Sequence, residues 1–250
     1  MNENIRQALI DLIRREAMAD NADGFFREPL VGFASAADPL FEEIIRQVGD
    51  HHLRPADILP EVKTVVSFFL PFTPMVVKSN RGSGPVSREW GRSYLAANIL
   101  INRLGALASE MVVASGGLAA SVPATHTFDE KTLKAGWSHR SAAMVAGLGR
   151  FGLNRMLIGP VGAAGRYGTI FISPELEPSP KPEDEPCLYF QDGRCQSCVR
   201  VCPVQALTVD GFDGHKCYDH VLKNSEMLNL GHLCDVCGKC VVAGPCAIIE

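Results

Sequence analysis

The residues of this 250-residue chain best able to do chemistry are its nine cysteines. All of them lie between Cys187 and Cys246, and none occurs earlier. Cysteines kept only for packing would be scattered, and an odd, clustered set is not typical of a complete disulfide framework. Thiolates at short spacings bind metal ions or clusters instead. The sequence therefore predicts a metal-binding segment between residues 187 and 246.

Two cysteine runs define the spacing within this segment. The first, CQSCVRVCP at residues 195–203, matches the last part of the bacterial ferredoxin run C-x2-C-x2-C-x3-C-P. Asp192 stands where the first cysteine of that run belongs, and Cys187 is its expected substitute on a longer loop. The second run, CDVCGKC at residues 234–240, has the first three spacings, and Cys246 follows it.

Together the runs predict a ferredoxin-like domain with two [4Fe-4S] clusters, which need eight of the nine thiolates. The expected ligands of the first cluster are Cys187, Cys195, Cys198 and Cys246. Those of the second are Cys202, Cys237, Cys240 and either Cys217 or Cys234. Zinc is the alternative, because tetrahedral thiolate sites also use C-x2-C pairs. The spacing C-x2-C-x3-C-P is typical of ferredoxins and is not required by zinc sites, so iron–sulfur clusters are the preferred interpretation.

A change of composition divides the chain into two segments. The stretch SPELEPSPKPEDEP, residues 173–186, holds five prolines and five carboxylates and cannot continue a helix or a central strand. We expect a solvated connector here, between a domain at residues 1–175 and a cluster domain at 176–250.

The first segment combines helix-like and strand-like patterns. Residues 62–72 form a continuous apolar run that predicts a buried strand. Helices are predicted at the N-terminus, at residues 92–115 and at residues 141–146, and further strands at 118–122, 156–158 and 169–172. This mixture predicts an α+β domain in which helices pack on a sheet.

The stretch AGLGRFGLN carries the spacing G-x-G-x-x-G at Gly147, Gly149 and Gly152. A dinucleotide site needs a strand before this motif and a helix beginning at its last glycine. Here a helix is predicted before the motif and a strand after it, so the backbone donors would point the wrong way for a pyrophosphate. The order predicts a helix C-cap with close backbone packing, and no NAD cofactor.

The segment from SHRSAAMVAGLGRFGLN to CQSCVRVCPVQAL resembles the epoxyqueuosine reductase family and, more distantly, the reductive dehalogenases. The family's AGLGWIGKN looks like AGLGRFGLN here, and its R-C-x-x-Y stretch looks like HKCYDHVL around Cys217. The resemblance implies a nitroreductase-like domain that binds cobalamin, followed by a domain with two [4Fe-4S] clusters that pass electrons to cobalt. The resemblance also implies that Cys217 is a cluster ligand and that the glycine turn belongs to the domain that binds the corrinoid. The implied partners are a reduced ferredoxin or flavodoxin-type donor and a small-molecule or modified-nucleoside substrate.

The chain also departs from the family's pattern. An Asp-x-x-Pro-x-x-Glu stretch precedes the glycine turn in these reductases and supplies their proton donor. Here Leu133 falls at the place of the Asp and His139 near the place of the Glu, while Asp129 is out of register. The departure favours a different reduction, or electron delivery alone.

The remaining polar candidates beside the expected cofactor pocket are His126, Asp129 and His139, which could donate a proton or contact a corrinoid. Surface or helix-capping roles are the alternative for each. Tyr94 could form the floor under a flat cofactor, although core packing is the simpler interpretation.

Net charge and the N-terminus narrow the class of protein. A net charge of −4 gives no overall basic field for nucleic acid. The N-terminal stretch is charged throughout and resembles neither a signal peptide nor a membrane span. We expect a cytoplasmic oxidoreductase that is not bound to a membrane. The alternatives are an electron carrier or binding protein without a catalytic centre, or a zinc-stabilised interaction protein.

Overall fold

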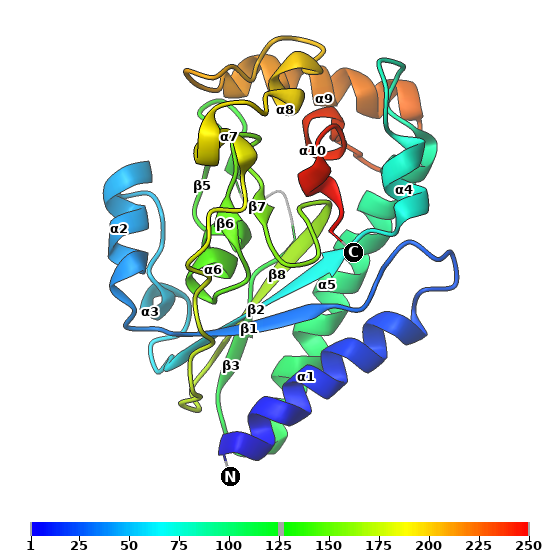
Figure 1. Ribbon diagram of the computed structural model, residues 1–250. Helices are drawn as coiled ribbons and strands as arrows, with labels where there is room; N and C mark the ends of the chain where they lie inside the picture. Colours follow the sequence, from blue (N-terminus) through cyan, green and yellow to red (C-terminus); the bar gives the residue numbers. More distant parts are fainter. Residues whose placement is uncertain (1, 125–127, 250) are drawn as a thin grey trace.

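A computed structural model describes residues 2–124 and 128–249. Its centre is a four-stranded antiparallel sheet in the order β1-β2-β8-β3 (Figure 1). These strands are β1 (Leu30–Ser35), β2 (Thr64–Pro71), β3 (Ala119–Ser121) and β8 (Gly165–Ile172). Two short antiparallel pairs accompany the sheet, β4 (Phe128–Asp129) with β5 (Lys134–Ala135), and β6 (Arg150–Phe151) with β7 (Leu157–Ile158).

Helices pack on both faces of the sheet. Those of the first segment are α1 (Asn2–Ala19), α2 (Pro39–Val48), α3 (Pro55–Ile58), α4 (Pro74–Ser79), α5 (Arg88–Ala114) and α6 (His139–Val145). Those of the second segment are α7 (Leu188–Asp192), α8 (Ser197–Arg200), α9 (Gly214–Leu228), α10 (Lys239–Val242) and the 3-10 helix η1 (Pro245–Ala247). The combination of helices with an antiparallel sheet is the α+β class expected from the sequence.

Strand β2 is the centre of the core, because every one of its residues is buried. Its side chains alternate between the two faces, as successive residues of a strand must. Val66 and Phe68 pack with α1 and α5 on one face, whereas Val65 packs with α2 and α6 on the other. The apolar run of residues 62–72 therefore corresponds to a strand covered on both sides, as predicted.

Helix α5 is the longest element, with 27 residues. Its length and composition would allow it to cross a membrane. In this fold it packs on β3 and β8 and against α1, and Leu100, Leu104 and Ala108 are buried in the main core. Part of its apolar surface is thus buried within the protein, whereas Ile99 and Val113 are exposed.

The cysteine segment lies at one end of the sheet, with α8, α9 and α10 close together (Figure 1). The N–H groups of Ala163 and Ala164 donate to the carbonyls of Cys246 and Ala247, at 2.9 and 3.0 Å. Leu228 and Val242 belong to the same buried cluster as residues of α1 and α5. The second segment therefore shares its apolar core with the first.

The strip at residues 173–186 was expected to be a solvated connector, and the structure shows that part of it is anchored. Leu176 is buried, and its N–H donates to Thr64 Oγ1 at 2.9 Å. The N–H of Ser179 donates to the carbonyl of Phe33 at 2.8 Å. This part of the strip thus lies against β1 and β2, and it connects β8 to the cysteine segment.

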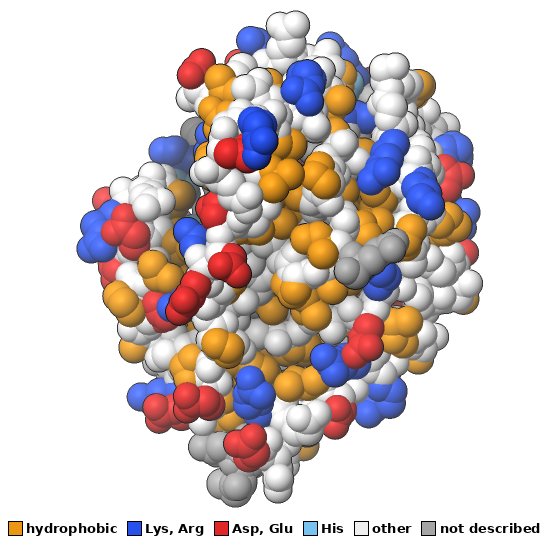
Figure 2. All heavy atoms as spheres, viewed as in Figure 1, with side chains coloured by type: hydrophobic (Ala, Val, Ile, Leu, Met, Phe, Trp, Pro, Cys, Tyr) orange, Lys and Arg blue, Asp and Glu red, His pale blue; other side chains and the backbone are white. Residues whose placement is uncertain are grey.

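Most predicted elements of the first segment are confirmed, including the helix before the glycine turn (α6) and the short strands after it (β6 and β7). Strand β1 and helix α2 were not predicted. Figure 2 shows cationic and anionic side chains interspersed on the face seen in Figure 1, with apolar side chains between them. No large basic area covers the described residues of this face.

Candidate functional site

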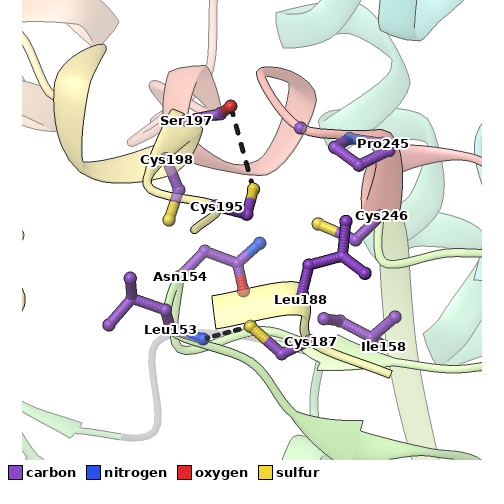
Figure 3. Close-up of a pocket in the computed structure, with 11 residues that line it drawn as sticks. Leu153, Asn154, Ile158, Cys187, Leu188, Cys195, Ser197, Cys198, Pro245 and Cys246 are labelled. Atoms are coloured by element: carbon purple, nitrogen blue, oxygen red, sulfur yellow. Dashed lines mark hydrogen bonds between the residues drawn. The ribbon is translucent and has the colours of Figure 1, made fainter. Parts of the chain in front are cut away.

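Four cysteines surround one small cavity, shown in Figure 3. They come from three places in the chain: the residue before α7, the loop and first turn of α8, and η1. These cysteines are Cys187, Cys195, Cys198 and Cys246, and we call them the first thiol group. They are the four predicted from the sequence for the first cluster. Apolar side chains such as Leu153, Ile158 and Leu188 form much of the remaining wall.

The surroundings of the first thiol group control its protonation. Burial, followed by the nearby thiols of Cys187, Cys198 and Cys195, raises the pKa of Cys246 to about 11. Burial likewise raises the pKa of Cys198. The backbone N–H of Leu153 donates to Cys187 Sγ at 3.5 Å. Bound metal would supply the positive charge that buried thiolates need.

A second set of thiols lies beside the first. The pKa of Cys240 is raised to about 12 by burial and then by the thiols of Cys237, Cys217, Cys202 and Cys198. Burial, followed by Cys237 and Cys202, raises the pKa of Cys217 to about 11. The N–H of Ala206 donates to Cys202 Sγ at 3.2 Å. Cys202, Cys217, Cys237 and Cys240 therefore form a second thiol group, adjacent to the first through Cys198.

Cys234 stands apart from both groups. Its side chain is 0% exposed in the main core, and its Sγ donates to the carbonyl of Gly91 at 3.5 Å. Burial raises the pKa of Cys234 to about 11, and the only charged neighbour that contributes is Asp235. Between the two cysteines that the sequence left open, the structure brings Cys217, and not Cys234, next to the other thiols.

All nine cysteines are free of disulfide bonds. Among residues 2–124 and 128–249, no three His, Cys, Asp or Glu side chains are close enough to hold a single metal ion.

A larger cavity of about 240 Å³ lies between the first segment and the second thiol group. Trp90, Tyr94 and Arg166 contribute to it from one side, and Asp235 and Cys237 from the other. The hydroxyl of Tyr94 donates to Asp235 Oδ1 at 2.6 Å. The guanidinium of Arg166 lies over the ring of Tyr94, 4.4 Å from its centroid. A thiol of the second group thus shares a cavity with a cation, a carboxylate and a phenol.

His139 is held by both of its ring nitrogens. Nδ1 lies 2.8 Å from Thr169 Oγ1, and Nε2 lies 3.0 Å from the carbonyl oxygen of Pro123. Because a carbonyl only accepts, Nε2 carries the proton and Nδ1 accepts from the hydroxyl of Thr169. Burial lowers the pKa of His139, and the charge of Arg166 lowers it further. This neutral, fully bonded imidazole fixes the loop before residue 124.

A second catalytic candidate, Asp129, does not line either cavity. Asp129 is exposed at the end of β4, and its Oδ1 accepts from the N–H groups of Lys131 and Thr132 in the following turn. These bonds lower the pKa of Asp129, and they correspond to the turn-capping alternative. His126 lies outside the described residues.

The glycine turn after α6 is packed against the chain itself. Gly147 has φ of +80°, and a Cβ there would meet the carbonyl oxygen of Pro180 at 2.4 Å. A Cβ on Gly149 would meet the carbonyl oxygen of Ile158 at 2.4 Å, and one on Gly152 would meet the Ile158 side chain at 2.5 Å. The three glycines permit close backbone approach, and none of them lines either cavity.

Several polar residues of these sites were not recognised from the sequence. Asp235 and Lys239 lie inside the second cysteine run, where the cysteines alone were considered. Arg140 follows His139, and its Nη1 donates to the carbonyl of Arg155 at 2.7 Å and contacts Met156 Sδ at 3.5 Å. A charged residue within a closely spaced cysteine run is a signal that could have identified Asp235 and Lys239.

Comparison with known proteins gives matches at the level of structure. No model of a protein family matches the chain, and no curated protein matches its sequence. A solved epoxyqueuosine reductase is 18% identical, with a TM-score of 0.60 over 96% of this chain and 66% of that one. Another, in complex with an epoxyqueuosine-modified tRNA-Tyr stem loop, is 18% identical, with a TM-score of 0.57 over 88% of this chain and 58% of that one.

A B12-dependent reductive dehalogenase is also similar, with 15% identity and a TM-score of 0.55 over 75% of this chain and 26% of that one. The chain thus spans less than two thirds of the length of these epoxyqueuosine reductases. At such identities the likeness concerns the fold. The resemblance expected from the sequence, strongest to epoxyqueuosine reductases and weaker to reductive dehalogenases, is confirmed at that level.

Proposed function

We propose that the protein is an iron–sulfur oxidoreductase of the epoxyqueuosine reductase type, with two [4Fe-4S] clusters serving the cavity at Tyr94 and Arg166. The observation that carries the proposal is the separation of eight thiols into two groups of four, with Cys237 of the second group lining that cavity. The fold similarity to reductases supports the same class of function.

The donor set fits such clusters. Each [4Fe-4S] cluster takes four thiolates, and backbone N–H groups commonly donate to the ligating sulfurs. The first thiol group would hold one cluster and the second thiol group the other, with N–H donors from Leu153 and Ala206 already directed at sulfur. Cys202, the cysteine before Pro203, joins the second group, as in the crossed ligation of two-cluster ferredoxins. When bound, the clusters would supply one-electron transfer.

The residues of the cavity supply binding and proton-holding groups. Arg166 places a positive charge where negative charge would develop on a reduced ligand. The Tyr94 hydroxyl holds a proton toward Asp235, and this pair is the best-placed proton source among the described residues of the cavity. Trp90 and Phe72 give the cavity an aromatic wall for a planar group.

Cobalamin is the cofactor implied by the resemblance. The volume of about 240 Å³ is below the roughly 300–1,000 Å³ of pockets that enclose drug-sized ligands, and a corrinoid is larger than such ligands. The described residues therefore enclose only part of a corrinoid, and the proposal does not require one. The alternative is that a substrate is reduced directly in the cavity. Modified nucleosides are one such class of substrate, because a similar solved structure contains an epoxyqueuosine-modified tRNA stem loop.

Two titrations test the proposal. Anaerobic protein is first mixed with reduced ferredoxin or flavodoxin, and bleaching of the cluster absorbance is followed with time. Transfer of about two electrons per chain, one for each cluster, is expected. Absence of bleaching with both donors and with dithionite would contradict the proposal.

Cob(II)alamin is then titrated and followed by absorbance, with Arg166→Ala as the variant and Arg46→Ala on α2 as the control. Binding that weakens only in Arg166→Ala would assign a corrinoid to the cavity. No binding would assign the cavity to substrate alone. The nine free thiols support a reducing, cytoplasmic setting for this chemistry.

A further inference from the structure

Lys239 is a buried cationic side chain within the cysteine run of the second thiol group. It stands between Cys237 and Cys240 in sequence and is only 6% exposed. Its Nζ donates to the carbonyl oxygens of Asn80 at 2.9 Å and Pro85 at 3.0 Å. Carbonyl oxygens only accept hydrogen bonds, so these contacts suit an ammonium group. Burying such a charge is costly unless it is bonded and serves a nearby negative charge.

Asn80 fixes the ammonium relative to the thiols. The Asn80 side chain is 0% exposed, and its Nδ2 donates to the carbonyl of Cys237 at 2.7 Å. Its Oδ1 accepts from the N–H of Ser87 at 3.1 Å. The loop after α4 is therefore tied to the cysteine run at both Cys237 and Lys239. These hydrogen bonds hold the side chains of Asn80 and Lys239 in place next to the cysteine run.

The two thiol groups differ in the fixed charges around them. The cavity of the first group is lined, besides its thiols, by apolar and uncharged residues such as Leu153, Asn154 and Leu188. The cysteine run of the second group contains Lys239, whose Nζ is held by the carbonyls of Asn80 and Pro85. Asp235, which lines the larger cavity, accepts a hydrogen bond from Tyr94. The buried positive charge is thus on the side of the second group.

We propose that Lys239 stabilises the reduced form of the second cluster and gives that cluster a higher reduction potential than the first. A reduced cluster carries one more negative charge than an oxidised one, and a buried cation stabilises it because the local dielectric constant is low. The more easily reduced cluster would then be the one beside the cavity at Tyr94 and Arg166. This inference rests on the proposed function, because it requires two clusters.

The test is a redox titration of the anaerobic protein with both clusters, followed by electron paramagnetic resonance. Cys187→Ala, which removes a thiol of the first group only, assigns the two signals. Lys239→Gln is the main variant, because its amide still donates to a carbonyl while the charge is removed. We expect the reduced-to-oxidised ratio of the second cluster to fall about tenfold at a given potential, which is a shift of about 59 mV for one electron.

Two controls separate charge from position. Lys239→Arg keeps the charge and should restore most of the potential. Lys216→Gln removes an exposed charge next to Cys217, which solvent screens, and should leave both potentials unchanged. A shift confined to the second cluster in Lys239→Gln supports the proposal. Unchanged potentials, or equal shifts of both clusters, would overturn it.

The wild-type protein provides a second test that does not depend on the folding of any Lys239 variant. Its second cluster should have the higher of the two potentials, and the reverse order would also refute the proposal. Failure of the proposed function is a different outcome, because protein with zinc or without iron would give no titration at all.

Discussion

Replacing Cys234 by alanine should leave both clusters in place and cost only packing energy. The sulfur is fully buried, and a Cβ on Gly91 would lie 3.2 Å from it, so it packs directly on the helix backbone. Removing one buried heavy atom of this size costs about 0.8 kcal/mol in transfer free energy. A residual cavity adds to this, because glycine has no side chain to fill it, for a total of about 1–2 kcal/mol.

The assay combines iron content with urea unfolding. Cys234→Ala should keep the full iron content and lower the unfolding midpoint by roughly 0.5 M, given urea m-values of about 1–3 kcal/mol/M. Cys217→Ala is the matched variant, since both thiols are free and have raised pKa values. It should lose about four irons, those of the second cluster. Loss of iron from Cys234→Ala, with none lost from Cys217→Ala, would refute the assignment of the ninth cysteine.

Three further predictions follow from the same geometry. Cys202→Ala should abolish the resonance signal of the second cluster and spare that of the first, and loss of only the first signal would contradict crossed ligation. Gly238→Ala should cost about 1–3 kcal/mol and loosen the second cluster, because the residue has φ of +68° and a Cβ would meet Trp90 at 2.3 Å; an unchanged urea midpoint would oppose this. Burial lowers the pKa of His139, so below about pH 6.5 the unfolded chain binds a proton that the folded chain does not, and stability falls as the pH falls. His139→Gln should reduce the difference between urea midpoints at about pH 5.5 and 7.5, although His52, whose pKa burial also lowers, will preserve part of it.

The sequence was most informative where a local pattern determines the structure. The apolar, β-branched and aromatic run at residues 62–72 predicts a strand buried on both faces, and it contains β2. The order of helix, glycine turn and strand around Gly147 follows from periodicity over a few residues, and it is confirmed by α6 and β7. Strand β1 and helix α2 were missed, because Gly32 interrupts the strand and the helix is only ten residues long.

The candidate site was harder to predict from the sequence, because it is assembled from distant parts of the chain. Spacing identified the cysteines and separated the first four, which are local except for Cys246. It could not choose between Cys217 and Cys234, since that choice depends on how α9 packs and on the contact of Cys234 with Gly91. The cavity joins Tyr94, Arg166 and Asp235, whose proximity depends on tertiary packing. The burial of Lys239 depends in the same way on Asn80 and Pro85.

The metal content of anaerobically purified protein tests the central claim most directly. Two groups of four thiols should hold two [4Fe-4S] clusters, so we expect brown protein with about eight irons and about eight acid-labile sulfides per chain. Cobalt and zinc are measured on the same sample. A colourless protein with stoichiometric zinc and no sulfide would contradict the account.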